Sequence, residues 1–222
     1  MRFLRALFLA LSVTCAVCPC LSAQVIFTNN DGDFISTGQT SGTLSLNGST
    51  LTQIQGLVNY GIPNESVSSP ASLGSLSLTT AAMSSGNILT GATFGSGGNI
   101  TFTYSNGVTF TGSFTAASFN PSSLAANTWQ FSGTIMNGIL TVPGYAPATV
   151  ATAVTVDLTT VGAPANCTQG GGCSFVDSAG TTNFTPPALN LVPELGSLTL
   201  VGSGLVGLAL LVRRRRSKGS VS

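Results

Sequence analysis

Apolar residues alternate with Thr, Ser, Asn and Gly through most of the chain between residues 24 and 190. This period of two is typical of half-buried strands, and turn-forming residues interrupt it roughly every eight to twelve positions. Thr, Val, Ile and Phe also favour strands intrinsically. We therefore expect about nine to eleven strands in one domain over residues 24–185. The predicted fold is all-β, an antiparallel β-sandwich or jelly roll.

The clearest hairpin is predicted over residues 99–116. A two-residue turn would set Phe102 opposite Thr111 and would divide the aromatic side chains between the two faces of the sheet. A three-residue loop at 105–107 sets Phe102 opposite Phe110, so that all apolar side chains share one face. We expect this longer loop, with its glycine in the left-handed conformation.

Two other Asn-Gly pairs are expected to form hairpin turns. Asn47-Gly48 follows an alternating segment at residues 44–46, and Asn137-Gly138 separates residues 129–135 from residues 139–142. Asn-Gly is the strongest short-range hairpin signal, because both residues tolerate a positive φ.

The distribution of charge limits the chemistry of this body. The chain has seven basic residues, six acidic residues and no His, and the basic residues are Arg2, Arg5, Arg213, Arg214, Arg215, Arg216 and Lys218. The long segment between Arg5 and Arg213 therefore contains no cationic side chain. This excludes a nucleic-acid binder, which must neutralise phosphates with Lys or Arg. It also excludes His-dependent catalytic triads and Schiff-base lysines.

The N-terminal segment has the layout of a secretory leader over residues 1–23. Arg2 and Arg5 supply a positive start, residues 4–17 form a predominantly apolar stretch, and small residues precede a cleavage site that ends at Ala23. We therefore expect the Sec machinery to export the chain, with removal of a short leader helix.

The C-terminal segment predicts a membrane anchor. Residues 195–212 carry no charge, and as a helix they would span roughly 27 Å, enough for a bilayer core. Four arginines follow at 213–216, which by the positive-inside rule hold residues 213–222 in the cytoplasm. The exported body then lies on the opposite side of the membrane, joined to the helix by an extended stalk at 186–194 that begins with two prolines.

The order of features at this end resembles the PEP-CTERM sorting signal of Gram-negative bacteria. A Pro-Glu motif stands just before the apolar span and the arginine cluster, and the residues that carry the resemblance are Val192, Pro193, Glu194, Leu195, Gly196, Arg213, Arg214, Arg215 and Arg216. The match covers about residues 191–218. It departs from the family's pattern at Leu195, which replaces the second proline and bears on how efficiently the motif is processed.

The resemblance implies a partner and a destination. In that family an exosortase-type membrane protease recognises the motif, and the precursor moves from the inner membrane to the cell surface or exterior. Strains that carry such proteins usually make exopolysaccharide. We therefore expect a non-enzymatic exported protein of the surface or exopolysaccharide matrix, with exopolysaccharide as a second candidate partner and no bound cofactor beyond the calcium ion considered below.

Two other functions stay open. A carbohydrate-binding module would stack sugars on exposed aromatic rings, for which the candidates are Trp129, Tyr60, Tyr104 and Tyr145, although the alternation around Trp129 and Tyr104 favours the core. A secreted hydrolase, the least favoured, would need a pair of carboxylates from among Asp31, Asp33, Glu65, Asp157 and Asp177.

Two clusters could carry structural chemistry. Cys167 and Cys173 are the cysteines left after leader removal, and outside the cytoplasm they are expected to form a disulfide that staples a surface loop. Asn29, Asp31 and Asp33 offer oxygen atoms at alternate positions, which could hold a calcium ion. The alternative for these three residues is a polar turn between two strands.

Overall fold

The computed structural model describes residues 24–123, 126–168, 171–187 and 189. The predicted leader at 1–23, the Pro-Glu motif, the apolar span at 195–212 and the basic tail at 213–222 lie outside the described residues. Within the described ranges, no helix has the length and apolar character needed to cross a membrane.

The described residues form 14 strands that hydrogen bonds join into one sheet, with a single short 3-10 helix. In chain order the elements are β1 (Val25–Asn30), β2 (Asp33–Ser36), β3 (Leu44–Gln55), η1 (Val58–Tyr60), β4 (Glu65–Ser66), β5 (Gly74–Thr80), β6 (Met83–Asn87), β7 (Gly91–Phe94), β8 (Gly97–Tyr104), β9 (Thr109–Pro121), β10 (Trp129–Ile135), β11 (Gly138–Thr141), β12 (Ala148–Val150), β13 (Val154–Ala165) and β14 (Ser174–Phe184).

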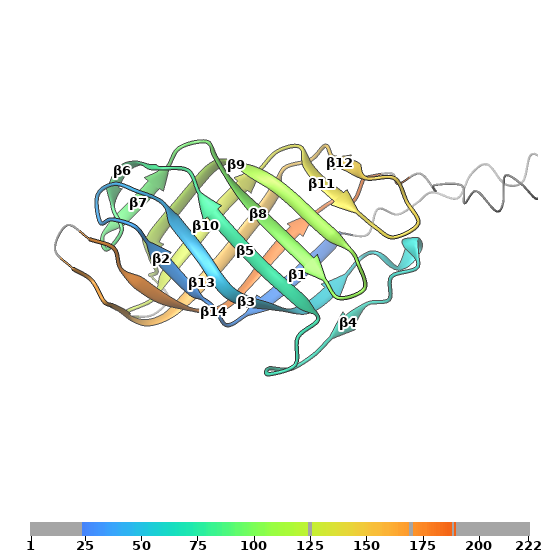
Figure 1. Cartoon of the computed structure of the whole chain (residues 1–222), viewed down its shortest axis with the longest axis horizontal. Coiled ribbons are helices and arrows are strands. Elements are labelled where there is room, and N and C mark those ends of the chain that lie inside the picture. Colours follow the sequence, from blue (N-terminus) through green and yellow to red (C-terminus); the bar gives the residue numbers. More distant parts are fainter. Residues whose placement is uncertain (1–23, 124–125, 169–170, 188, 190–222) are drawn as a thin grey trace, which may run out of the picture.

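Eight of these strands close into a barrel. Along the chain, each of the eight pairs antiparallel with the next. They are β1, β3, β5, β8, β9, β10, β13 and β14. The last strand then pairs antiparallel with the first, with Val25 opposite Phe184 (Figure 1). The other six strands extend the ends of this ring. The all-β antiparallel prediction is confirmed, but the strands form one closed sheet rather than the two separate sheets of a sandwich.

The predicted hairpin loop is confirmed. Phe102 lies opposite Phe110, and the Tyr104 N–H donates to the Val108 carbonyl oxygen over 2.8 Å. Gly107 has φ +92° and its N–H donates to the Tyr104 carbonyl oxygen over 2.9 Å. The requirement that apolar side chains share the inner face thus fixed the loop length.

The two other predicted Asn-Gly turns are wrong, because neither pair reverses the chain: Asn47-Gly48 lies within β3, and Asn137-Gly138 lies at the short break between β10 and β11. Gly48 has φ +75° and lies inside β3, where the register with β5 shifts between Leu46 and Ser49. Asn137 has φ +57°, and the chain after it continues along β9 as β11 instead of returning along β10. A positive φ suits a β-bulge as well as a hairpin turn, and here the long partner strand selects the bulge.

Aromatic rings fill the interior in two groups. Phe27, Phe102, Phe110 and Phe184 form a closed quartet, with ring centroids 5.0 to 6.0 Å apart around the circle. The second group has ring contacts of similar length and contains Phe34, Phe114, Phe119, Phe131, Phe175 and Trp129. Such rings bury large apolar areas, and their edge-to-face and stacked contacts add to that gain.

We expect Gly133→Ala to lower the free energy of unfolding by about 1–3 kcal/mol, the usual cost of overpacking a core. A Cβ at this inward-facing position of β10 would lie 2.8 Å from Phe114 Cδ1 and 3.0 Å from Phe131 Cε1. Urea unfolding followed by tryptophan fluorescence measures the change.

Gly95→Ala is the matched control. The nearest atom to a Cβ there is the Ala82 carbonyl oxygen at 3.7 Å, an ordinary contact. Equal stability of the two variants would contradict a filled interior at Gly133.

Candidate functional site

Both ends of the described chain meet at one end of the barrel. The start of β1 and the end of β14 are neighbours through the Val25 and Phe184 pair. After β14 the chain stays against the body: the Tyr60 hydroxyl donates to the Pro187 carbonyl oxygen over 3.1 Å, and Leu189 packs against the core. The part of the predicted stalk that is described, residues 186, 187 and 189, therefore begins on this surface.

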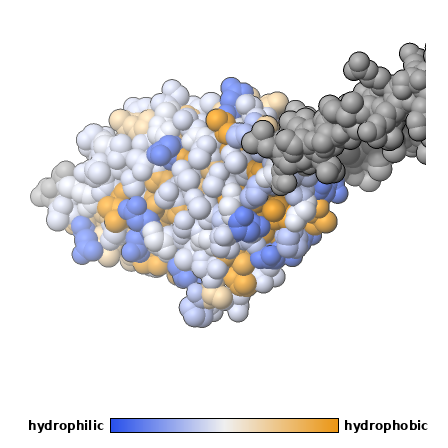
Figure 2. All heavy atoms as spheres, turned by 45° about the vertical axis from the view of Figure 1, so that its right-hand side comes forward, coloured by the Kyte–Doolittle hydropathy of each residue, from blue (hydrophilic) through white to orange (hydrophobic). Residues whose placement is uncertain are grey.

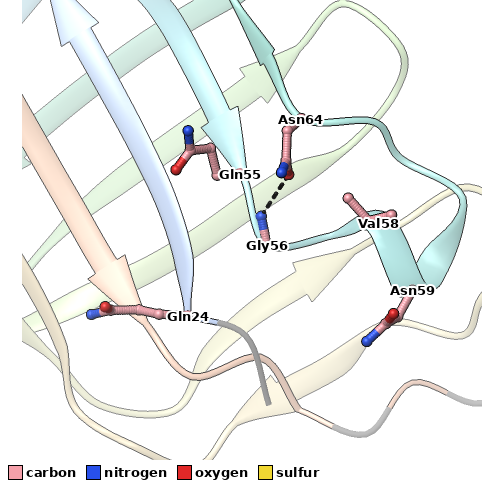
Figure 3. Close-up of a pocket in the computed structure, with 6 residues that line it drawn as sticks. All are labelled: Gln24, Gln55, Gly56, Val58, Asn59 and Asn64. Carbon is pink, nitrogen blue, oxygen red and sulfur yellow. Dashed lines mark hydrogen bonds between the residues drawn. The ribbon is translucent and has the colours of Figure 1, made fainter. Parts of the chain in front are cut away.

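An uncharged cavity opens beside the start of β1. It measures about 240 Å³ and is lined by Gln24, Gln55, Gly56, Val58, Asn59 and Asn64 (Figure 3). The Gly56 N–H donates to Asn64 Oδ1 over 3.0 Å, which ties the end of β3 to the segment after η1. Sequence patterns did not mark this cavity, because the pairing of β1 with β3 brings Gln24 beside residues 55–64 and no motif links the two segments.

A carboxylate and a buried phenol join two elements next to this end. Tyr104, at the end of β8 and only 2% exposed, donates its hydroxyl hydrogen to Glu65 Oε2 on β4. Burial raises the pKa of Tyr104 from 10.0 to about 12, and the hydrogen bond to Glu65 and its negative charge add to the rise. The pair therefore holds the loop between η1 and β5 against the barrel as long as the phenol keeps its proton.

The free energy of unfolding is expected to fall as pH rises from 10 to about 12. In this window the unfolded chain loses the Tyr104 proton while the folded protein keeps it, so deprotonation favours the unfolded state. Urea unfolding at pH 9, 10, 11 and 12 measures the slope. Tyr104→Phe should show a shallower fall, because the other tyrosines are unchanged. Equal slopes for the two proteins would rule out this linkage.

The three residues of the predicted calcium site do not share a face. Asp31 and Gly32 have φ values of +61° and +97°, and they separate β1 from β2. The break shifts the alternation by one residue, so Asn29 is buried whereas Asp33 is exposed. Asn29 Nδ2 donates to Ser49 Oγ over 2.8 Å, and Asp31 Oδ2 accepts from Ser69 Oγ over 3.2 Å. Among the described residues no cluster of three or more His, Cys, Asp or Glu is placed to hold a metal.

The two cysteines are joined at the opposite end of the barrel. Cys167 and Cys173 form a disulfide with their Cα atoms 4.3 Å apart. Cys173 is buried, and its N–H donates to Ser36 Oγ over 3.0 Å. Gln39 Nε2 donates to the Thr168 carbonyl oxygen over 2.9 Å. The disulfide therefore staples the β13–β14 loop next to the loop that follows β2.

The aromatic candidates for sugar stacking are mostly inside the protein. Trp129 is 7% exposed and lies 5.2 Å from Phe175, centroid to centroid, and Tyr104 is in the core. Tyr60 and Tyr145 are half-buried and pack edge to face, 5.4 Å apart. The alternation in the sequence had favoured the core for Trp129 and Tyr104, and this is confirmed.

A shallow groove on the outer face of the sheet is a site that the sequence did not indicate. It measures about 410 Å³ and crosses β8, β9 and the break between β10 and β11. Its lining is neutral and consists of Asn99, Ile100, Thr101, Thr111, Gly112, Ser113, Met136, Asn137 and Ile139. The groove depends on the bulge at Asn137, which the Asn-Gly pattern alone assigned to a hairpin.

The outer surface reflects the scarcity of charge. In Figure 2 the visible face is mostly pale, the colour of residues of intermediate hydropathy, with small orange and blue areas between them. Hydroxyl and amide groups hydrate this surface, since Ser, Thr and Gln stand at the outward positions of strands such as β5 and β10.

Comparisons of the chain with protein-family models, with curated proteins and with solved structures found no match.

Proposed function

We propose that the chain is a non-enzymatic exported protein that carries a PEP-CTERM-type sorting signal and becomes part of the cell surface or exopolysaccharide matrix. The proposal rests on one observation above all, the order of the C-terminal features: Pro193-Glu194, an uncharged span of 18 residues and four consecutive arginines. An exosortase-type protease would cut near the motif and release the body from the inner membrane.

The body has properties that suit such a role. Its interior is filled by aromatic and aliphatic side chains, and its strands leave the chain ends together on one surface. The stalk starts from that surface, held by the Tyr60 hydroxyl at Pro187. Pro193 lies four residues beyond Leu189. A fully extended segment of that length spans at most about 14 Å, so the body would lie close to the protease.

The intact mass of the protein recovered from its native host tests the proposal. We expect a chain that begins at residue 24 and ends within residues 193–195, lighter by two hydrogen atoms for the disulfide. Glu194→Ala should retain the arginines if the protease reads that carboxylate, whereas Asn190→Ala, just outside the motif, should be processed normally. A wild-type chain that retains the arginines would mean a membrane-tethered body, and the matrix role would be abandoned.

The groove across β8, β9 and the bulge favours carbohydrate binding as a second candidate function. Neutral amide and hydroxyl side chains beside Met136 and Ile139 suit a neutral polysaccharide, which offers hydroxyl groups and apolar ring faces.

Calorimetric titration with the host's exopolysaccharide tests this candidate. Thr111→Lys would block the groove and should weaken binding at least tenfold, about 1.4 kcal/mol. Thr103→Lys is the control, since Thr103 is exposed on β8 but does not line the groove. Unchanged heats for both variants would remove the groove as the binding site.

The predicted calcium ion at Asn29, Asp31 and Asp33 stays a prediction.

A further inference from the structure

The start of the exported chain is fixed in place after a single residue. Val25 is fully buried and pairs with Phe184, and Ile26 pairs with Gln55. Only Gln24 precedes this strand if the leader is removed after Ala23, as the sequence predicts. Its main chain lies tightly against Gly56, where φ is +87° and a Cβ would collide with the Gln24 carbonyl oxygen.

The side chain of Gln24, in contrast to its main chain, is not held by any of the described residues. It is exposed and its amide makes no hydrogen bond with the described residues. In Figure 3 it points away from Val58 and Asn59, which line the other side of the same cavity. Rotation about the bonds of this one side chain therefore disturbs neither the sheet nor a neighbour.

We propose that Gln24 becomes a modification site once the leader is removed, and that the mature chain begins with pyroglutamate. The freed α-amine attacks Cδ of its own side chain. The new bond between the α-nitrogen and Cδ forms, the bond between Cδ and Nε2 breaks, and ammonia leaves with a proton from the amine. The step needs no oxidant, reductant or co-reactant, and it rests on the predicted export.

The surroundings favour the uncharged product. The six residues that line the cavity include no carboxylate, so none of them would pair with an α-ammonium group. Glu65 follows the lining residue Asn64 in the sequence, but its carboxylate already accepts the hydrogen bond of the Tyr104 hydroxyl. Cyclisation removes the positive charge.

The modification would complete a pattern in the sequence. Residues 24–212 contain no Lys, Arg or His, so the α-ammonium would be the single cationic group of a chain released at the Pro-Glu motif. Cyclisation leaves that chain without any cation and without any amine. A partner or reagent that needs an amine would then have nothing to bind or acylate.

The test analyses the N-terminal peptide of the protein exported by a host that removes leaders. The protein is first treated in denaturant with an N-hydroxysuccinimide ester, which blocks any free amine before it can cyclise during handling. Cleavage before Asp31 then releases the peptide 24–30. We expect essentially all of it to be unlabelled and lighter than the uncyclised peptide by one ammonia. Pyroglutamyl aminopeptidase should then expose Val25.

Gln24→Ser is the control, since serine cannot form the ring and its peptide should carry one label. A wild-type peptide that begins at Gln24 and is labelled would overturn the proposal while leaving export intact. A peptide that begins at another residue would overturn it together with the predicted leader site. Neither readout depends on processing at Pro193, so failure of the sorting proposal is seen separately in the intact mass.

Discussion

The antiparallel pairing of β1 with β14 is the contact on which the rest of the structure depends. It joins the first and last strands of the chain and turns a meander into a closed ring. Closure satisfies the backbone donors and acceptors that two free sheet edges would otherwise expose. It also brings Phe27 and Phe184 together, which completes the aromatic quartet that Phe102 and Phe110 begin.

Closure also explains how a body with so little charge can be stable and hydrated. Strands such as β5 and β10 send most of their apolar residues inward and their exposed Ser, Thr and Gln residues outward, so hydroxyl and amide groups meet the solvent. The few described acids include Asp33, which is exposed on β2, and Asp157, which is partly exposed on β13. An acidic surface without cations resists association between copies and with anionic envelopes.

Local patterns predicted strands and one register well, but not the features set by distant partners. The alternation of Phe102 and Phe110 determined their loop, because one face had to be apolar. Asn137 has the same conformational preference in a turn and in a bulge, and only the pairing with β9 decides between them. The break at Asp31 leaves Asn29 buried and Asp33 exposed, a change of face that the spacing of these residues did not predict. The cavity and the outer groove combine segments far apart in the chain, and no local pattern marks them.

The meeting of the two chain ends has a mechanical consequence. If the proposed leader and apolar span hold the precursor during export, they pull on the two ends of the body. Tension between those two points acts on the start of β1 and the end of β14, which are antiparallel neighbours and meet at the Val25 and Phe184 pair. It therefore opens the hydrogen bonds between β1 and β14 one after another, instead of loading all of them in parallel. The closed ring would therefore open at this seam by unzipping, and removal of the leader would end that load.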